Sequence, residues 1–198
     1  QNHLTIDGSS EKLITKDAGL DFIHGISISG GTISSTGGEL RISDNSSFSG
    51  GMISISSGTM SLNGSSIFNG STLALSNGTL SLNGSTNLNG GTISVSSGTF
   101  ALGGDFTKNG GNLTLGDSTF SLLSDLTWTS DSLLEISILE LNDQALTLGD
   151  ASSDFRINNA LTLDQANEKL ISGSADLEFA ELLTISSGEL SSRGGEIR

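Results

Sequence analysis

The chain repeats itself at every twentieth position between about Leu13 and Leu122, and this period constrains the fold more than any other feature. Within each repeat apolar residues alternate with Ser or Thr, as in residues 79–82 (TLSL), which is the periodicity of a β-strand. Ser-Gly or Asn-Gly follows each short apolar segment, and both Gly and Asn tolerate the backbone angles of a tight corner. The recurring columns are Gly30, Gly50, Gly70, Gly90 and Gly110; Leu13, Ile33, Ile53, Leu73, Ile93 and Leu113; Leu20, Leu40, Met60, Leu80, Phe100 and Phe120; and Phe22, Ile42, Leu62, Leu82, Leu102 and Leu122. A further column reads Ile28, Phe48, Phe68 and Leu88, is interrupted at Lys108 and is expected to continue at Trp128.

One such repeat is too small to bury its own apolar side, so the repeats must stack on one another. Stacking with parallel strands about 4.8 Å apart pairs the backbone and places equivalent side chains directly above each other. The sequence therefore predicts an all-β fold, a single parallel β-helix (β-solenoid) over residues 1–198, with about 20–22 residues and three short strands per coil. A two-sheet sandwich is the alternative, but it needs longer strands and does not require a fixed spacing.

A second, longer period divides the chain. Residues 1–41 align without a gap on residues 158–198, an offset of 157, with 20 identities in 41 positions. We therefore expect residues 1–157 to be one long repeat unit and residues 158–198 to be the start of the next copy. Division of 157 by eight leaves about 19.6 residues per coil, close to the short period, so the unit is expected to contain eight coils.

The short period changes along the chain. The spacing of 20 extends to about residue 130, and a spacing of 22 then aligns Leu133, Phe155 and Leu177. The two periods place Leu177 in different columns, so we expect an irregular coil within about residues 124–154.

Charge is distributed unevenly. No Asp, Glu, Lys or Arg occurs from Asn45 to Gly104, whereas acidic residues are frequent from Asp105 onward and the net charge is −14. This balance argues against binding to nucleic acid, and the lack of a long apolar run argues against insertion into a membrane. The chain has no cysteine, which excludes disulfides and Cys-ligated zinc. The uncharged stretch is a candidate contact surface for a neighbouring shaft or a neutral glycan, because little ion desolvation opposes such a contact.

The repeats at residues 69–78 (NGSTLALSNG) and 91–100 (GTISVSSGTF) resemble the β-helical shafts of large bacterial surface adhesins, of the filamentous-haemagglutinin and autotransporter-passenger types. This resemblance implies a right-handed β-helix, export, and a location that is extracellular or at the cell surface.

Catalytic arrangements are poorly represented. His3 and His24 have Ala160 and Glu181 as counterparts at the offset of 157, so we expect neither histidine to serve the repeat unit. A polysaccharide-active β-helix enzyme would use clustered carboxylates, and the closest clusters are Asp125 with Asp131 and Asp150 with Asp154, near Arg156. Most of these acids adjoin predicted corners, so a solvated edge is the preferred interpretation and we expect no enzyme. The same acidic corners, at Asp117, Asp150 and Asp154, offer oxygen ligands for structural calcium; we expect no other cofactor.

Polar columns provide the candidate ligand face. Asn69, Asn89 and Asn109, and likewise Asn63 and Asn83, are expected to form ladders of side-chain amide hydrogen bonds. Regularly spaced hydroxyl and methyl groups are the type of surface that orders water or contacts neutral sugars, although here the second rank, Ser61, Ser81, Ala101 and Ser121, is incomplete. The column that offers such a face is Thr59, Thr79, Thr99 and Thr119.

Together these features predict a structural repeat module of a long extracellular β-solenoid, acting as a stiff stalk or filament subunit of an adhesin. Its expected partners are adjacent copies of the same repeat, joined end to end. An ice- or glycan-binding solenoid that uses the threonine column is the first alternative, and the polysaccharide-active enzyme is the second.

Overall fold

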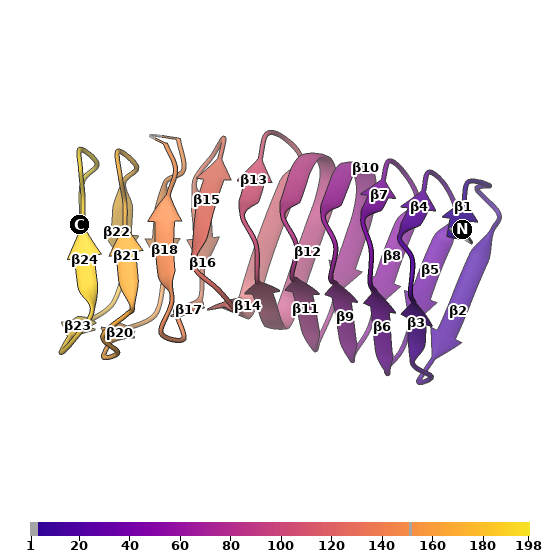
Figure 1. Ribbon diagram of the computed structural model, residues 1–198, viewed down its shortest axis with the longest axis horizontal. Helices are drawn as coiled ribbons and strands as arrows, with labels where there is room; N and C mark the ends of the chain where they lie inside the picture. Colours follow the sequence, from indigo (N-terminus) through magenta and orange to yellow (C-terminus); the bar gives the residue numbers. More distant parts are fainter. Residues whose placement is uncertain (1–3, 151) are drawn as a thin grey trace.

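Parallel strands wind around three sides of an elongated stack, so the predicted β-solenoid is confirmed (Figure 1). The computed structural model describes residues 4–150 and 152–198, which contain 24 β-strands and no helix. Most strands pair in parallel with strands of the coils before and after them, so most neighbours in a sheet are about one coil apart in sequence. Nine complete three-sided coils follow from this order, and a tenth begins at β24 (Glu189–Ser191).

The three sides are named here by the order in which the chain meets them. The first side contains β1 (Leu4–Ile6), β4 (Ile26–Ile28), β7 (Ser46–Phe48), the starts of β10 (Ser66–Leu75) and β12 (Thr86–Leu102), β13 (Phe106–Lys108), β15 (Leu126–Ser130), β18 (Ala145–Leu148), β21 (Lys169–Ile171) and β24. The second side contains β2 (Lys12–Lys16), β5 (Thr32–Ser35), β8 (Met52–Ile55), the middle parts of β10 and β12, the start of β14 (Asn112–Leu122), β16 (Leu134–Ile136), β19 (Phe155–Ile157) and β22 (Leu177–Phe179). The third side contains β3 (Leu20–Phe22), β6 (Glu39–Ile42), β9 (Thr59–Leu62), β11 (Thr79–Leu82), the ends of β12 and β14, β17 (Ile138–Glu140), β20 (Leu161–Leu163) and β23 (Leu183–Ile185).

The short-period columns of the sequence are the vertical columns of the structure. Leu80 pairs with Met60 below it and with Phe100 above it, and Phe100 pairs with Phe120. These side chains point inward and are fully buried, while the alternate residues of β9 and β11 are partly exposed. A single continuous core therefore runs along the stack, and no coil forms it alone.

Glycine is required at one corner because the chain adopts a left-handed conformation there in successive coils. Gly58, Gly78 and Gly98 have φ of 96°, 114° and 97°. A Cβ atom on Gly78 would lie 2.0 Å from the carbonyl oxygen of Gly58, and one on Gly98 would lie 2.0 Å from the oxygen of Gly78. Any side chain would thus be both strained and in collision with the coil below.

The register becomes irregular in the second half, although three strands per coil continue. Phe106 pairs with Trp128, 22 positions on, whereas Thr119 pairs with Ile138, 19 positions on, and Ala145 with Lys169, 24 positions on. The first side remains paired throughout, but β16 pairs only with β19, and no pairing joins β17 to β20 among the described residues. Corners of unequal length therefore interrupt the second and third sides at neighbouring levels.

Two sequence alignments across this stretch were wrong. Trp128 pairs with Phe106, so it does not continue the column that Lys108 interrupts, and Lys108 pairs with Ser130 instead. Leu134, and not Leu133, pairs with Phe155, and the Leu133 side chain is half exposed. In both cases a corner of changed length had shifted the column by one or two positions.

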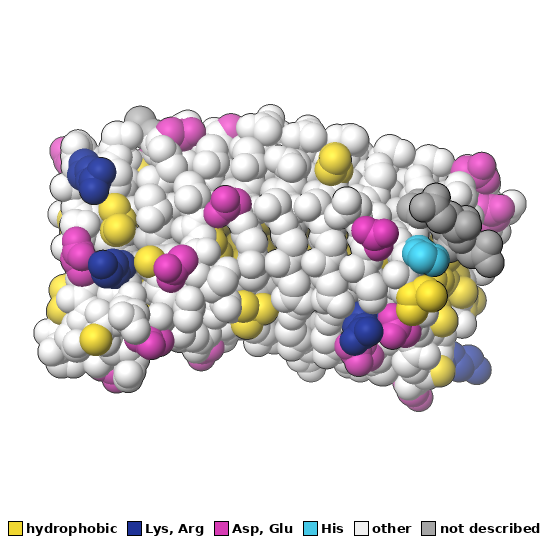
Figure 2. Space-filling view, viewed as in Figure 1, with side chains coloured by type: hydrophobic (Ala, Val, Ile, Leu, Met, Phe, Trp, Pro, Cys, Tyr) yellow, Lys and Arg dark blue, Asp and Glu magenta, His cyan; other side chains and the backbone are white. Residues whose placement is uncertain are grey.

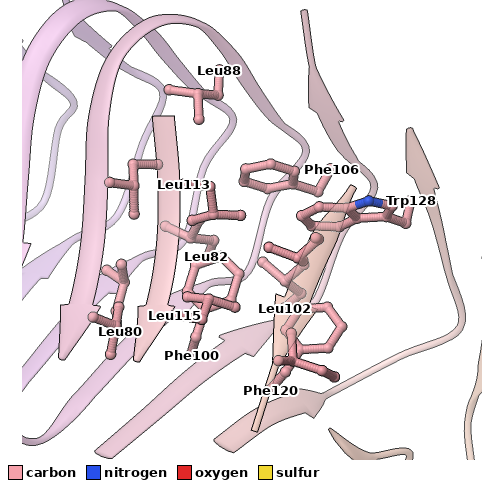
Figure 3. Packing of buried hydrophobic residues seen from close by; sticks show 14 of the residues in the cluster. Leu80, Leu82, Leu88, Phe100, Leu102, Phe106, Leu113, Leu115, Phe120 and Trp128 are labelled. Carbon is pink, nitrogen blue, oxygen red and sulfur yellow. The ribbon is translucent and has the colours of Figure 1, made fainter. Parts of the chain in front are cut away.

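Aromatic side chains gather where the two sides are interrupted (Figure 3). The rings of Phe106 and Trp128 are stacked, with centroids 4.7 Å apart and an interplanar angle of 4°. Phe120 meets Trp128 edge to face, with centroids 5.7 Å apart, and Phe100 stacks on Phe120. The Phe120 and Phe155 rings are tilted by 49°, with centroids 5.8 Å apart. Large rings thus maintain the core where backbone pairing between coils is reduced.

The two matching segments of sequence have the same structure, strand for strand. Displacement by the long period carries β1 onto β20, β2 onto β21, β3 onto β22, β4 onto β23 and β5 onto β24. The pairs between their coils recur as well: Leu4 with Ile26 corresponds to Leu161 with Leu183, and Lys12 with Thr32 corresponds to Lys169 with Glu189. However, β1 lies on the first side and β20 on the third side of the eighth coil, so the offset is 23 sides. The expected eight coils would have been 24 sides.

Candidate functional site

The threonine column forms an in-register ladder on the third side. Thr59, Thr79, Thr99 and Thr119 occupy four adjacent strands and pair directly with one another. Each threonine side chain is half-buried and points away from the core, because the next residue along the strand points inward. Spacing of about 4.8 Å between strands sets four uncharged hydroxyl and methyl groups in a straight row. Such a row can contact a neutral polar surface.

The ladder is one rank wide. In the neighbouring rank Ser61 and Ser81 are half-buried, but Ala101 and Ser121 are only 3% and 6% exposed. The Asn142 side chain covers Ser121 and donates a hydrogen bond to its Oγ at 2.8 Å. The row ends at Glu39 on one side and Ile138 on the other, so its regular part is limited to four coils.

Asparagine ladders hold two of the corners, as the sequence predicts. The side-chain amide of Asn89 donates to the Asn69 carbonyl oxygen at 3.0 Å, and Asn109 donates to Asn89 at 3.3 Å. Asn83 donates to Asn63 in the same manner at 2.7 Å. These side-chain amides form hydrogen bonds with the equivalent amides of adjacent coils. Because asparagine is neutral, the ladders add no charge to the surface of the central coils.

Figure 2 shows few charged side chains over the central part of the visible face, whereas charged residues lie toward both ends. This central region contains residues 45–104, which carry no ionisable side chain. Its outward positions are mostly Ser, Thr and Asn, with Met52 and Ile67 exposed among them. The region offers a broad neutral contact area.

The carboxylates of the second half connect successive coils, a role that sequence analysis missed. Asp105 accepts a hydrogen bond from the backbone N–H of Thr127 at 2.8 Å, and Asp125 accepts one from Ala145 at 2.7 Å. Asn45 makes the equivalent bond to Ser65 at 2.8 Å in the uncharged half. The signal was present in the sequence, because these three residues share one short-period column of Asn, Ser or Asp.

A second set of carboxylates does the same on another corner. Asp154 accepts a hydrogen bond from the backbone N–H of Asp176 at 2.9 Å, and Asp176 accepts one from Glu196 at 2.8 Å. Each bond satisfies a backbone donor of the next coil with a charged acceptor. The acidic corners therefore have a structural use in these positions.

The carboxylate pairs considered for catalysis are also engaged elsewhere. Asp131 accepts from the Lys108 ammonium, which holds the pKa of that carboxyl below its ordinary value. Asp150 accepts from the hydroxyl of Ser153 and from Ser152, and these hydrogen bonds lower its pKa as well. A general acid needs the opposite shift, because it must hold a proton near neutral pH.

Among the described residues, neither the acidic corners nor His24 forms a recognisable metal centre. No group of three or more His, Cys, Asp or Glu side chains placed to hold a metal ion occurs in residues 4–150 and 152–198. Asp117 is exposed on β14, and Asp150 bonds to its own corner. His24 is exposed, and His3 lies outside the described residues.

A cleft of about 530 Å³ opens on the third side where β17 and β20 are unpaired. Leu139 and Leu141 line it together with four acidic side chains. Three of these acids accept hydrogen bonds: Asp143 accepts from Asn167, and Asp164 accepts from the side-chain amide of Gln165. Glu168 accepts from the backbone N–H groups of Asp164 and Gln165. The cleft could not be foreseen, because it results from corner lengths and not from a residue motif.

The described part of the chain contains no helix long and apolar enough to cross a membrane. Comparison with protein-family models, with curated proteins and with solved structures found no match.

Proposed function

We propose that this chain is a structural module of a long extracellular β-solenoid and serves as a stiff spacer, in the manner of an adhesin stalk or filament subunit. The observation that carries the proposal is the recurrence of strands and register between residues 1–41 and 158–198. A segment that recurs with its inter-coil pairing intact is suited to extension by further copies of itself. The resemblance of its repeats to bacterial surface shafts supports the same role and location.

Stiffness follows from how the coils are connected. Backbone pairing on the first side runs from β1 to β24, and one core continues beneath it. Bending the stack would have to separate paired strands or open the packed interior. The principal partners in this proposal are adjacent copies of the module, because the pairing between coils of residues 1–41 recurs in residues 158–198 and can be continued by a further copy.

Chains extended by whole modules test this proposal. Residues 42–198 would be appended once, twice and three times to the full chain, and rod length would be measured by electron microscopy and small-angle scattering. Each addition is expected to lengthen a straight rod by about 37 Å, from about 4.8 Å per coil. A matched control appends residues 52–198, which removes β7 together with the corners on both sides of it. The equivalent of β6 would then run directly into β8 without a turn, so this chain should not continue the rod. Globular or freely hinged particles from the in-register chains would contradict the proposal.

The in-register threonine ladder favours one second candidate, a ligand face for ice or a neutral glycan. Its test is the double substitution Thr79→Val and Thr99→Val, which removes two hydroxyls and retains the branched shape. Thermal hysteresis or glycan-array binding that is present in the parent chain and lost in this variant would support the candidate. Absence of both activities in the parent chain would reject it.

A further inference from the structure

We infer that successive modules of this solenoid are rotated by one third of a turn, so that each surface feature moves to a different side from one module to the next. This inference rests on the proposed function, because it concerns how copies of the module join. Its partner is another copy of this chain's own repeat.

The rotation follows from the side count. A solenoid with three strands per coil returns to the same side only when the offset between copies is a multiple of three sides. The observed offset from β1 to β20 is 23 sides, one fewer than eight full coils. The equivalent of a first-side strand therefore lies on the third side, and the equivalents of β2 and β3 lie on the first and second sides.

Local contacts show that the displaced copy is a true structural equivalent and not a chance alignment. Glu11 accepts hydrogen bonds from the backbone N–H groups of Asp7 and Gly8 at 2.9 and 3.0 Å. Their counterparts in the second copy repeat this arrangement, because Glu168 accepts from Asp164 and Gln165 at 2.8 and 3.1 Å. The corner with these bonds joins the first and second sides in one copy, and the third and first sides in the other.

The pairing at the C-terminal end extends the same equivalence. Leu20 pairs with Leu40 on the third side, and Leu177 bridges to Ile197, their counterparts, on the second side. The second copy keeps the register of the first over three columns of strands, although each column lies on a different side. Further residues of the second copy can therefore continue the solenoid only if this rotation is kept. The sides are interchangeable because each has the same short-strand geometry and inward apolar pattern.

This rule has a consequence for recognition. The threonine ladder occupies the third side here, and its equivalents would occupy the second side in the next module and the first side in the one after. Three modules restore the starting side after 23 complete coils, or about 110 Å at about 4.8 Å per coil. A flat binding partner that contacts only one side of the solenoid would find the threonine ladder once in every three modules. The three modules together present the ladder on all three sides.

Disulfide trapping tests the rotation. The chain would be extended by residues 42–198, with Glu189→Cys combined with Met52→Cys in the second copy. Thr32 pairs with Met52 in the structure, and Glu189 is the equivalent of Thr32 but lies on the first side. The rotated junction therefore places the two cysteines on adjacent strands, within the Cα separation of about 4.4–6.8 Å that a disulfide requires. Loss of both free thiols on mild oxidation, by mass spectrometry, is the expected result.

Two matched variants make the outcome decisive. In the original chain, Lys169→Cys with Glu189→Cys should cross-link, because these residues pair on the first side. In the extended chain, Glu189→Cys with Thr72→Cys of the second copy should not, because Thr72 lies one coil beyond Met52. A folded, rod-like extended chain that fails to trap the Met52 pair would overturn the rotation and leave the spacer role standing. An extended chain that does not fold as one solenoid would instead count against the spacer role, and the rotation would fall with it.

Discussion

The uncharged central coils and the acidic C-terminal coils solve the same stacking problem by different chemistry. In residues 45–104 the strands of successive coils are spaced by 20 residues, with one local shift where Asn69 pairs with Gly90, and amide ladders such as Asn69–Asn89 join the corners without charge. In the C-terminal half the coils vary in length, and carboxylates such as Asp105 and Asp125 accept backbone hydrogen bonds from the next coil. The regular half depends on strict repetition, whereas the irregular half depends on individual side chains.

Removal of the ring at Trp128 should have the largest effect, because this residue maintains the core between the two halves. The side chain is fully buried and contacts three phenylalanine rings. Trp128→Ala is expected to lower the free energy of unfolding by about 3–5 kcal/mol. It should also separate the unfolding of the two halves, as expected when neighbouring units of a linear repeat are uncoupled. Urea denaturation followed by circular dichroism and hydrogen exchange would measure both effects.

Trp128→Phe is the matched control for that substitution. The Trp128 indole N–H is buried without a hydrogen-bond partner, so phenylalanine removes an unsatisfied donor while it retains a stacked ring. A loss below about 1.5 kcal/mol is expected. A loss as large as that of the alanine variant would show that the aromatic stack is not what joins the halves.

The structure of the regular coils could largely be predicted from the sequence, because the sequence of these coils is strictly repetitive. From Ile26 to Leu122 each column is spaced by 20, so the register, the buried residues and the amide ladders follow directly from alignment. Beyond Leu122 a change in corner length moved Trp128 and Leu133 out of their expected columns. The carboxylate acceptors and the cleft beside β17 depend on how corners of different coils meet, which a single-coil pattern does not specify.

Acidification should weaken the C-terminal half more than the central coils. Hydrogen bonds lower the pKa values of Asp131 and Asp150 in the folded state, so ionisation of these groups stabilises the fold. That stabilisation is complete above the unfolded pKa of about 3.9 and is lost as pH falls through the lower folded values. Hydrogen exchange at pH 7 and near pH 3 should show protection lost first in residues 105–198. Equal loss in residues 45–104, which have no carboxylate, would refute the proposed division of roles.

Neutralisation of one carboxylate isolates a single part of that effect. The Lys108 side chain is 10% exposed and occupies an inward position of β13, with its ammonium paired to Asp131. Asp131→Asn leaves that buried cation without its counter-charge and should cost about 1–3 kcal/mol, discounted because Asp131 itself is partly exposed. The combined variant Lys108→Met with Asp131→Asn should recover most of the loss, because methionine suits the apolar interior. Chemical denaturation of the three variants would decide, and a double variant weaker than Asp131→Asn alone would exclude this account of Lys108.

The smallest effect concerns the amide ladder of the central coils. Asn89 both donates to Asn69 and accepts from Asn109, so Asn89→Ala removes two side-chain hydrogen bonds at once. Because the ladder is exposed to water, the loss should be about 0.5–1 kcal/mol and independent of pH between 3 and 7. Asn87→Ala, on the same strand, is the control and should change the stability by less than about 0.5 kcal/mol. Thermal unfolding at both pH values would measure these differences. If the stability lost in Asn89→Ala differed between the two pH values, the amide ladder would depend on the ionisation of carboxylates in neighbouring coils. The neutral half would then also rely on charge.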